Sequence, residues 1–329
     1  MGRRFINLLG EHEAIKEVFL VGGKQLRQNR NGDLYLQMIL SDKTGALNAM
    51  LWNANDHIAN LFENGDFVEI DGKSQIHNGS MQIIVKGIDK VEASSINEED
   101  FIFISQDDVA RLTQELSTIL RGIEDPNIRN LAECFLADET FMTGFTRAPA
   151  AVKNHHAFHG GLVAHVVNLM RVAQAVAPFY PNVDTSLLVM GAFLHDIGKI
   201  DELQYARDLG YSDEGQLIGH LVMGVSMLEK KLHEAENLSG EAIPQETALR
   251  LKHMIVSHHG RYDFGSPKVP MTPESIALHL LDDLDAKINQ FENILNDDAN
   301  AGHWTAYHPG LGRKLFRGGT SNNDNEKQQ

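Results

Sequence analysis

An apolar run ends in two residues of metal-ligand type in the stretch Leu187-Leu188-Val189-Met190-Gly191-Ala192-Phe193-Leu194-His195-Asp196. The run predicts a buried helix, and a histidine next to an aspartate at its end delivers two ligands from one turn. Further side chains of the same kind lie elsewhere in the chain: His165, His220, His258 and Asp282. Nitrogen and oxygen ligands without thiolates suit manganese, iron, magnesium or zinc. Such an ion activates water near neutral pH, which indicates hydrolysis of a phosphate ester.

The histidines are concentrated in the second half of the chain, where 13 of the 16 lie between His155 and His308. A single histidine on an apolar helix is most often a core residue with satisfied hydrogen bonds. The order of His165, the His195-Asp196 pair and Asp282 favours a metal site over a set of unrelated core residues.

Composition bounds the class of protein. The chain has 329 residues, 42% hydrophobic and 22% charged, which is enough for two globular domains. Its one cysteine, Cys134, excludes an internal disulfide and a cysteine-based zinc site, and it fits a cytoplasmic protein. We predict no signal peptide and no contact with a membrane, because the apolar run is too short to cross a bilayer. The net charge of −16 argues against electrostatic coating of nucleic acid but leaves room for a local basic patch.

The chain is predicted to be a multidomain protein with an all-β first part and an all-α second part. Five strand patterns, with a short helix pattern at 53–64 between the third and the fourth, are typical of an OB-fold barrel. The predicted strands are 18–21, 34–40, 46–52, 66–71 and 81–85. The predicted helices are 107–123, 127–142, 162–177, 184–199, 215–235, 245–259 and 273–294. The resulting division is 1–95 for the barrel, 96–145 for a helical linker, 146–316 for the helical domain and 317–329 for a disordered tail.

The barrel carries candidate contacts for single-stranded nucleic acid, because OB-folds stack bases on aromatic rings and follow phosphates with cations. Candidate stacking platforms are Tyr35, Trp52 and Phe19, and candidate cations are Lys24, Arg27, Arg30 and Lys43. Aromatic residues in strands are more often part of the core, so both interpretations remain open for the rings.

Three stretches of the helical part resemble the motifs of the HD-domain metal-dependent phosphohydrolases. They are His155-His156-Ala157-Phe158-His159-Gly160-Gly161-Leu162-Val163-Ala164-His165, Phe193-Leu194-His195-Asp196-Ile197-Gly198-Lys199 and His279-Leu280-Leu281-Asp282-Asp283-Leu284-Asp285-Ala286-Lys287. The resemblance implies that one ion is bound by His165, His195, Asp196 and Asp282, with Asp282 rather than Asp283 or Asp285 as the last ligand. His220 and His258 match the extra ligands of two-metal members, although His220 could also be a solvent-facing helix residue.

Other residues near these motifs are candidates for catalysis or substrate binding. Lys199 could stabilise the charge of the scissile phosphate, or it could be a cation placed favourably near a helix C-terminus. His259 could be a ligand, a proton donor or an exposed residue. His155, His156 and His159 could contact substrate, or they could form an ordinary polar loop before a helix.

An OB-like barrel followed by an HD domain, at this length, resembles the YhaM-type 3′→5′ exoribonucleases. The resemblance implies manganese-dependent removal of nucleotides from the 3′ end of a single strand, with RNA favoured over DNA, and it suggests a homo-oligomer. The alternative is an HD hydrolase of free or signalling nucleotides with a regulatory barrel. A third interpretation, a nucleic-acid binder without activity, is disfavoured by the complete ligand set. No Gly-Tyr-Pro triplet follows His258-His259, which argues against a cyclic dinucleotide phosphodiesterase.

Overall fold

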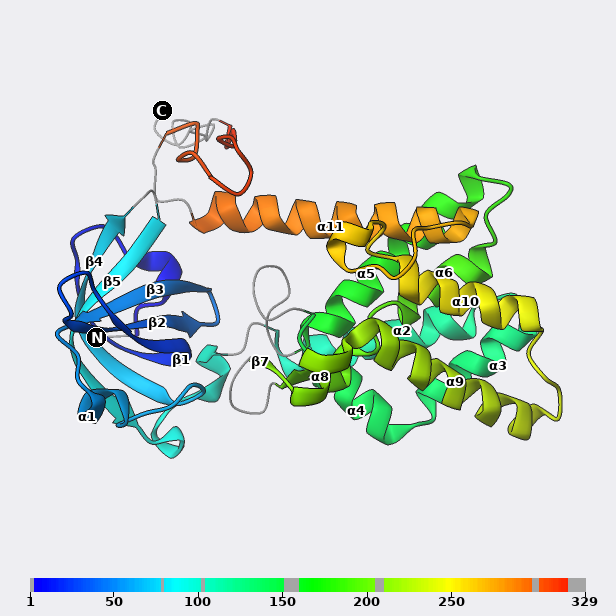
Figure 1. The fold of residues 1–329 in the computed structure, drawn as a ribbon, viewed down its shortest axis with the longest axis horizontal. Coiled ribbons are helices and arrows are strands. Elements are labelled where there is room, and N and C mark those ends of the chain that lie inside the picture. The colour runs from blue at the N-terminus through cyan, green and yellow to red at the C-terminus, as the bar shows by residue number, and fades with distance from the viewer. Residues whose placement is uncertain are drawn as a thin grey trace, which may run out of the picture. The chain divides into compact units, whose positions relative to one another are not determined.

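The computed structural model describes residues 3–77, 80–101, 104–150, 160–204, 210–297 and 302–318. Its contacts divide the chain into two compact units (Figure 1). One unit comprises Met1–Phe101 and Gln290–Gln329, and the other comprises Ile102–Asn289. The tail predicted to be disordered lies, from residue 319 onward, outside the described residues.

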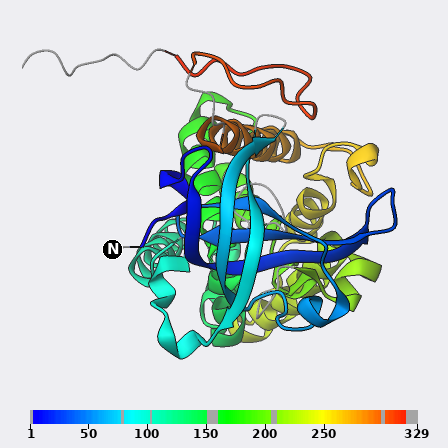
Figure 2. The ribbon, with the colours of Figure 1, turned by 90° about the vertical axis from the view of Figure 1, so that its left-hand side faces the viewer.

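The first unit contains a closed five-stranded barrel with the strand order β1-β2-β3-β5-β4. All neighbouring strands are antiparallel except β3 and β5, which are parallel (Figures 1 and 2, blue to cyan). The predicted OB-fold barrel is therefore confirmed. Its elements are β1 (Ala14–Gln28), β2 (Leu34–Asp42), β3 (Gly45–Trp52), α1 (Asp56–Ala59), β4 (Phe67–His77) and β5 (Ser80–Val91), flanked by the 3-10 turns η1 (Ile6–Leu8), η2 (Ala93–Ser95) and η3 (Glu98–Phe101).

Alternation of side chains explains the barrel. Successive residues of a strand point to opposite faces, so apolar residues at every second position fill one interior. In β2, Leu36, Met38 and Leu40 are fully buried while the residues between them are not. The same pattern in β4 places Val68 and Ile70 in this core.

The second unit is helical, as predicted. Its helices are α2 (Gln106–Arg121), α3 (Pro126–Leu136), α4 (Glu139–Arg147), α5 (Gly161–Val176), α6 (Thr185–Leu194), α7 (Lys199–Glu202), α8 (Asp213–Ile218), α9 (His220–Ser239), α10 (Gln245–Ser257) and α11 (Pro273–Asp297), with the 3-10 turns η4 (Ala177–Phe179) and η5 (Tyr262–Phe264) and a two-stranded sheet of β6 (Leu203–Gln204) and β7 (Gly210–Tyr211). The last residues of α11 belong to the first unit.

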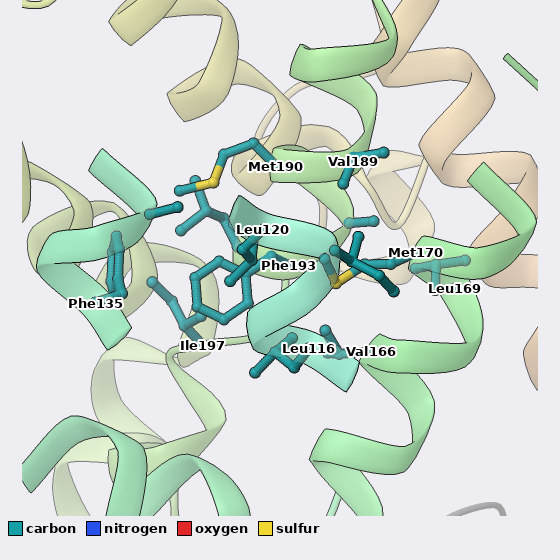
Figure 3. Packing of buried hydrophobic residues seen from close by; sticks show 14 of the residues in the cluster. Leu116, Leu120, Phe135, Val166, Leu169, Met170, Val189, Met190, Phe193 and Ile197 are labelled. Carbon is teal, nitrogen blue, oxygen red and sulfur yellow. The ribbon is translucent and has the colours of Figure 1, made fainter. Parts of the chain in front are cut away.

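Helices α2, α3 and α4 contribute to the core of the helical unit, although the sequence analysis assigned this segment to a linker. Leu116 of α2 and Phe135 of α3 are buried in one cluster with Phe193 of α6 (Figure 3). Phe145 of α4 belongs to the same cluster. The Phe193 ring centroid lies 5.4 Å from that of Phe135 and 5.5 Å from that of Phe145. Apolar residues at helical spacing on α2–α4 need a partner surface, and α5 and α6 supply it.

The segment Gly161–Phe179 is the one helical stretch among the described residues that is long and apolar enough to span a membrane, with a mean hydropathy of 1.3. Half of it is buried inside the helical unit. It behaves as the core helix that the sequence predicts, because its apolar side chains already pack against neighbouring helices.

Three predicted helices are broken in the structure, and the pattern at 127–142 forms α3 and α4. The pattern at 215–235 forms α8 and α9, which are separated at Gly219, whose φ of 79° lies in the left-handed region. The pattern at 184–199 ends as α6 at Leu194, and α7 starts at Lys199. The last two breaks place His195, Asp196 and His220 at helix ends, where their side chains can converge.

The helical unit contains a buried carboxylate, Glu274, that we expect to contribute to its response to acid. The Glu274 side chain is 1% exposed, and its carboxylate accepts hydrogen bonds from Arg250 Nη2 at 2.5 Å and from the Asp184 backbone N–H at 2.9 Å. Burial alone would raise the pKa of Glu274, but these two donors lower it below its ordinary value of 4.5. The stabilisation is therefore present above about pH 4.5 and is lost as the pH falls.

We expect Arg250→Met to lower the free energy of unfolding by about 3 kcal/mol at pH 7, because a buried carboxylate loses its cation. Urea unfolding at pH 7 and at pH 4 measures the effect, and the difference from the parent protein should shrink at pH 4, where the carboxylate can be protonated. Arg261→Met, at an exposed position, serves as the control. A difference that stays constant between the two pH values would contradict this role for Glu274.

Candidate metal centre

Five helix ends or faces deliver the predicted ligands to one place in the helical unit. His165 lies on α5, His195 and Asp196 follow α6, His220 starts α9, His258 and His259 follow α10, and Asp282 lies on α11. The turn between α6 and α7 packs closely on the start of α9. A Cβ atom at Gly198 would lie 2.1 Å from the His220 carbonyl oxygen, so only glycine permits this approach.

The first cluster consists of His165, His195 and Asp282. The His165 Nε2 atom lies 3.2 Å from His195 Nε2 and 3.3 Å from Asp282 Oδ1, and the last two atoms are 3.9 Å apart. Ligands of a tetrahedral ion at about 2.0–2.1 Å are separated by roughly 3.3 Å, so the spacing fits a metal ion. His165 and His195 are buried, which shields the cluster from solvent.

The second cluster consists of His220, His258 and His259, whose ligand atoms all lie within 4.8 Å of one another. Both His220 Nε2 and His258 Nε2 lie 3.5 Å from Asp196 Oδ1. The other oxygen of this carboxylate, Oδ2, lies 3.2 Å from His195 Nε2 in the first cluster. Asp196 thus faces both clusters, whereas the sequence analysis placed it with the first ion only.

The histidine rings are oriented by hydrogen bonds at Nδ1, which leaves each Nε2 directed at the centre. Two Nδ1 atoms donate to carboxylates: that of His165 to Asp285 Oδ2 at 2.7 Å and that of His220 to Glu202 Oε1 at 2.9 Å. The other three donate to backbone carbonyls: His195 to Ala192 at 2.9 Å, His258 to Ile255 at 2.8 Å and His259 to Phe264 at 2.9 Å. A partner on one ring nitrogen, which fixes the tautomer and raises the basicity of the other, is the usual environment of a metal-binding histidine.

Two buried atoms of the centre have no hydrogen-bond partner within the described parts of the chain, namely Asp196 Oδ1 and His220 Nε2. In addition, Nε2 of His165 and Nε2 of His195 face each other, and both are acceptors when their Nδ1 atoms carry the protons. Buried acceptors that face one another are costly unless a cation lies between them. The residues present therefore fit bound divalent ions.

The pKa values of three side chains in the centre are shifted from their ordinary values, in different directions. Burial would lower the pKa of His165, but hydrogen bonds to Asp282 and Asp285 raise it to about 9. Burial and the neighbouring His258 lower the pKa of His259 to about 4, so this ring is neutral at pH 7. Although burial opposes it, the Asp196 carboxylate raises the pKa of Lys199, whose ammonium lies 2.6 Å from Asp196 Oδ2. A fixed positive charge thus lies beside the carboxylate that faces both clusters.

Lys199 is the first residue of α7, a helix of four residues, and its ammonium pairs with Asp196. The candidates His155, His156 and His159 lie outside the described residues.

One row of side chains crosses three strands of the barrel. Arg27 of β1 is paired in register with Tyr35 of β2, which is paired with Trp52 of β3. The Tyr35 and Trp52 ring centroids are 5.2 Å apart, and the Trp52 side chain is 48% exposed. A cation and two aromatic rings are the side chains with which OB-folds hold phosphates and stack bases, and nucleic-acid contact by these three residues stays a prediction.

Two other barrel candidates have structural roles. The ring of Phe19 is fully buried in the barrel core, so its prediction as a stacking platform is wrong. The Lys24 ammonium donates to the carbonyls of Ala59 and Phe62 and pairs with Glu63, so it is not available to a phosphate. Lys43 pairs with Asp100, while Arg30 is exposed in the turn between β1 and β2.

Comparison with known proteins agrees with this two-part architecture. The HD domain family matches residues 162–287, and the family described as OB-fold nucleic acid binding domain matches residues 19–91. The curated 3'-5' exoribonuclease YhaM of Halalkalibacterium halodurans is 33% identical over 287 residues, which cover 86% of each chain. The protein of the same name from Bacillus subtilis strain 168 is 32% identical over 284 residues, which cover 86% of this chain and 88% of the relative. The chain belongs to the YhaM family.

Membership of the YhaM family confirms the predicted resemblance and the predicted pair of domains. The HD domain is a metal-dependent phosphohydrolase domain, and the histidine and aspartate clusters described above are compatible with divalent metal. The OB-fold domain supports binding of single-stranded nucleic acid.

In this YhaM-family chain, the sequence analysis missed the residues that orient two histidines of the candidate metal centre. Asp285 accepts from His165 and also from Asn168 Nδ2 at 2.6 Å, and Glu202 accepts from His220. Asp285 lies three residues after Asp282 and Asn168 three residues after His165, so each shares a helix face with a ligand. That spacing could have identified Asp285 and Asn168 as partners of the candidate ligands, but the sequence analysis considered Asp285 only as a direct ligand.

We expect Asp285→Asn to weaken metal binding by about 10- to 100-fold, because an amide orients the His165 ring less well and no longer raises its basicity. Titration of the metal-free protein with manganese, followed by calorimetry, measures the change. Asp283→Asn, an exposed position on the same helix that pairs with Lys287, is the matched control. Equal affinities of the two variants would contradict the proposed orientation of His165.

Aromatic side chains border the second cluster. Tyr262 and Phe264, in η5 after His259, are 65% and 60% exposed. Arg261 lies over the Phe264 ring at 5.4 Å from its centroid. Because His259 donates to the Phe264 carbonyl, these side chains are held at the rim of the metal centre.

Proposed function

We propose that this protein is a metal-dependent phosphodiesterase that removes nucleotides from the 3′ end of single-stranded RNA. The observation that carries the proposal is the Asp196 carboxylate, which faces two histidine clusters and pairs with a charged lysine. The relatives named 3'-5' exoribonucleases support the direction and the RNA substrate. The metal-dependent hydrolysis that the HD domain implies is consistent with this arrangement.

Two divalent ions, manganese in our proposal, would supply an activated water and charge neutralisation at the phosphate. We assign His165, His195, Asp196 and Asp282 to one ion, and Asp196, His220, His258 and His259 to the other. The assignment of His259 as a ligand follows from its place in the second cluster and from a pKa of about 4, which leaves the ring neutral at pH 7, as metal binding requires.

The remaining residues of the centre orient the substrate and stabilise its charge. The Lys199 ammonium lies beside Asp196 and can pair with the oxygens of the scissile phosphate as negative charge develops. We place the terminal base at the rim formed by Arg261, Tyr262 and Phe264, because exposed rings next to a cation stack well on a base. The row of Arg27, Tyr35 and Trp52 would hold a more distant part of the strand.

We further propose a cytoplasmic location, in line with the single cysteine, and a homo-oligomer, which rests on the family resemblance alone.

A gel assay with 5′-labelled single-stranded RNA and manganese tests the proposed function. We expect a ladder that shortens from the 3′ end, requires the metal and is absent with Asp196→Asn. Mononucleotides and a single-stranded DNA of the same sequence are assayed in parallel. An intact RNA together with hydrolysed mononucleotides would overturn the proposal in favour of a nucleotide hydrolase with a regulatory barrel.

A further inference from the structure

A hairpin at residues 302–318 presents aromatic side chains to solvent. Trp304 and Phe316 form an antiparallel bridge, and their ring centroids are 5.0 Å apart. Their side chains are 55% and 60% exposed, and Tyr307 nearby is 57% exposed. Large rings on a surface usually mark a binding site, because burying them would release water.

The backbone of the hairpin determines which side chains face outward. The Thr305 N–H donates to the Leu315 carbonyl at 2.9 Å, and the Arg317 N–H donates to the His303 carbonyl at 2.8 Å. Thr305 and Leu315 are 1% and 4% exposed, so the adjacent Trp304 and Phe316 point to the opposite side. The exposure of the two rings is therefore a property of the fold of this segment.

The charge of the hairpin is opposite to that of the rest of the chain. Residues 302–318 contain three basic residues, Arg313, Lys314 and Arg317, and neither aspartate nor glutamate, although the chain carries a net charge of −16. Arg317 donates to the Leu295 carbonyl, while Arg313 and Lys314 are exposed. Exposed cations next to exposed rings are the combination that binds single-stranded nucleic acid.

We propose that the hairpin 302–318 is a second binding surface for single-stranded nucleic acid, with bases stacked on Trp304 and Phe316 and phosphates held by Arg313 and Lys314. The proposal rests on the proposed function in one respect, namely that the bound strand is the upstream part of the substrate. An apolar protein partner would have no need of the cations, and a free phosphate would have no need of the rings. The observations therefore favour a polyanion that carries bases.

The chain contains two tryptophans, Trp52 on the barrel and Trp304 on the hairpin. Tryptophan fluorescence can therefore measure binding at each surface separately. In the full-length, metal-loaded Trp52→Phe variant, Trp304 is the only tryptophan. We expect its fluorescence to be quenched by a single-stranded oligouridylate whose 3′ end is protected by phosphorothioate linkages. Inorganic polyphosphate, which has charge but no bases, should quench it far less.

Two further variants measure the contributions separately. We expect Trp304→Ala to weaken binding of the oligouridylate roughly ten-fold, because stacking of one base on an aromatic ring is worth that order of affinity. Replacing Arg313 and Lys314 by alanine should reduce the salt dependence, the slope of log K against log salt, by about 1.4, or about 0.7 for each cation. Tyr180→Ala, an aromatic residue 58% exposed after η4, is the matched control and should leave both quantities unchanged.

Failure of this proposal can be told apart from failure of the proposed function. Turnover of a uridylyl dinucleotide by the unaltered chain tests the metal centre without a long strand. If the unaltered chain does not hydrolyse the dinucleotide but Trp304 is still quenched by oligouridylate, the proposed function fails and the hairpin remains a binding surface. Unquenched Trp304, or emission that changes with protein concentration and not with oligouridylate, would overturn the proposal, and the second result would assign the hairpin to contacts between copies of the chain.

Discussion

Turnover is expected to fall by about 1,000-fold or more in Asp196→Asn, a loss of roughly 4 kcal/mol in transition-state stabilisation. One oxygen of Asp196 lies 3.2 Å from His195 Nε2, and the other lies 3.5 Å from Nε2 of His220 and of His258. Asparagine preserves the size of the side chain but replaces one of these oxygens by an N–H₂ group, which cannot bind a metal ion. Because the carboxylate serves both clusters, we expect the loss of at least one ion and weaker binding of the other.

The measurement combines turnover of single-stranded RNA with the metal content of the purified protein. Asp283→Asn removes a carboxylate from an exposed pair with Lys287 and should retain both activity and metal. Thermal unfolding of both variants shows whether the helical unit remains folded, since the buried Asp196 also pairs with Lys199. An Asp196→Asn protein that keeps two ions and turns over within ten-fold of the parent would refute the shared position of this carboxylate.

Lys199→Met is expected to lower kcat by about 100-fold while the metal content stays unchanged. The ammonium lies 2.6 Å from Asp196 Oδ2 and is 18% exposed, so it is near the ligands and accessible to a substrate phosphate. Its removal leaves the Asp196 carboxylate with more negative charge to offer a metal ion. A purely structural role would instead predict loss of metal or of stability.

Separate values of kcat and KM, with metal content and thermal unfolding, test the role of Lys199. Lys199→Arg keeps the charge and should recover part of kcat, and Lys287→Met on α11 is the control at an exposed lysine. The Asp196 carboxylate raises the pKa of Lys199, so the side chain is protonated at neutral pH. A Lys199→Met protein with normal kcat would exclude a direct role in charge stabilisation.

The sequence by itself determined the barrel and the helical fold of the second part, and it supplied the histidines and aspartates that we assign to the metal centre. These are local properties: alternation in 34–40 specifies a strand, and the apolar run before His195 specifies a buried helix. Such features depend on residues that are close in the chain, so periodicity and motif spacing identify them.

Only the tertiary structure decided how these residues work together. The position of Asp196 between two clusters depends on Gly198, which allows the turn after α6 to pack on the start of α9. The support of His165 by Asp285 joins residues 120 positions apart. The burial of Phe19 and the hydrogen bonds of Lys24 depend on which side of the barrel each residue faces and on what packs there. These contacts are set by packing between segments that are distant in the sequence. The pattern of residues along the chain identifies candidate side chains but does not show which of them are in contact.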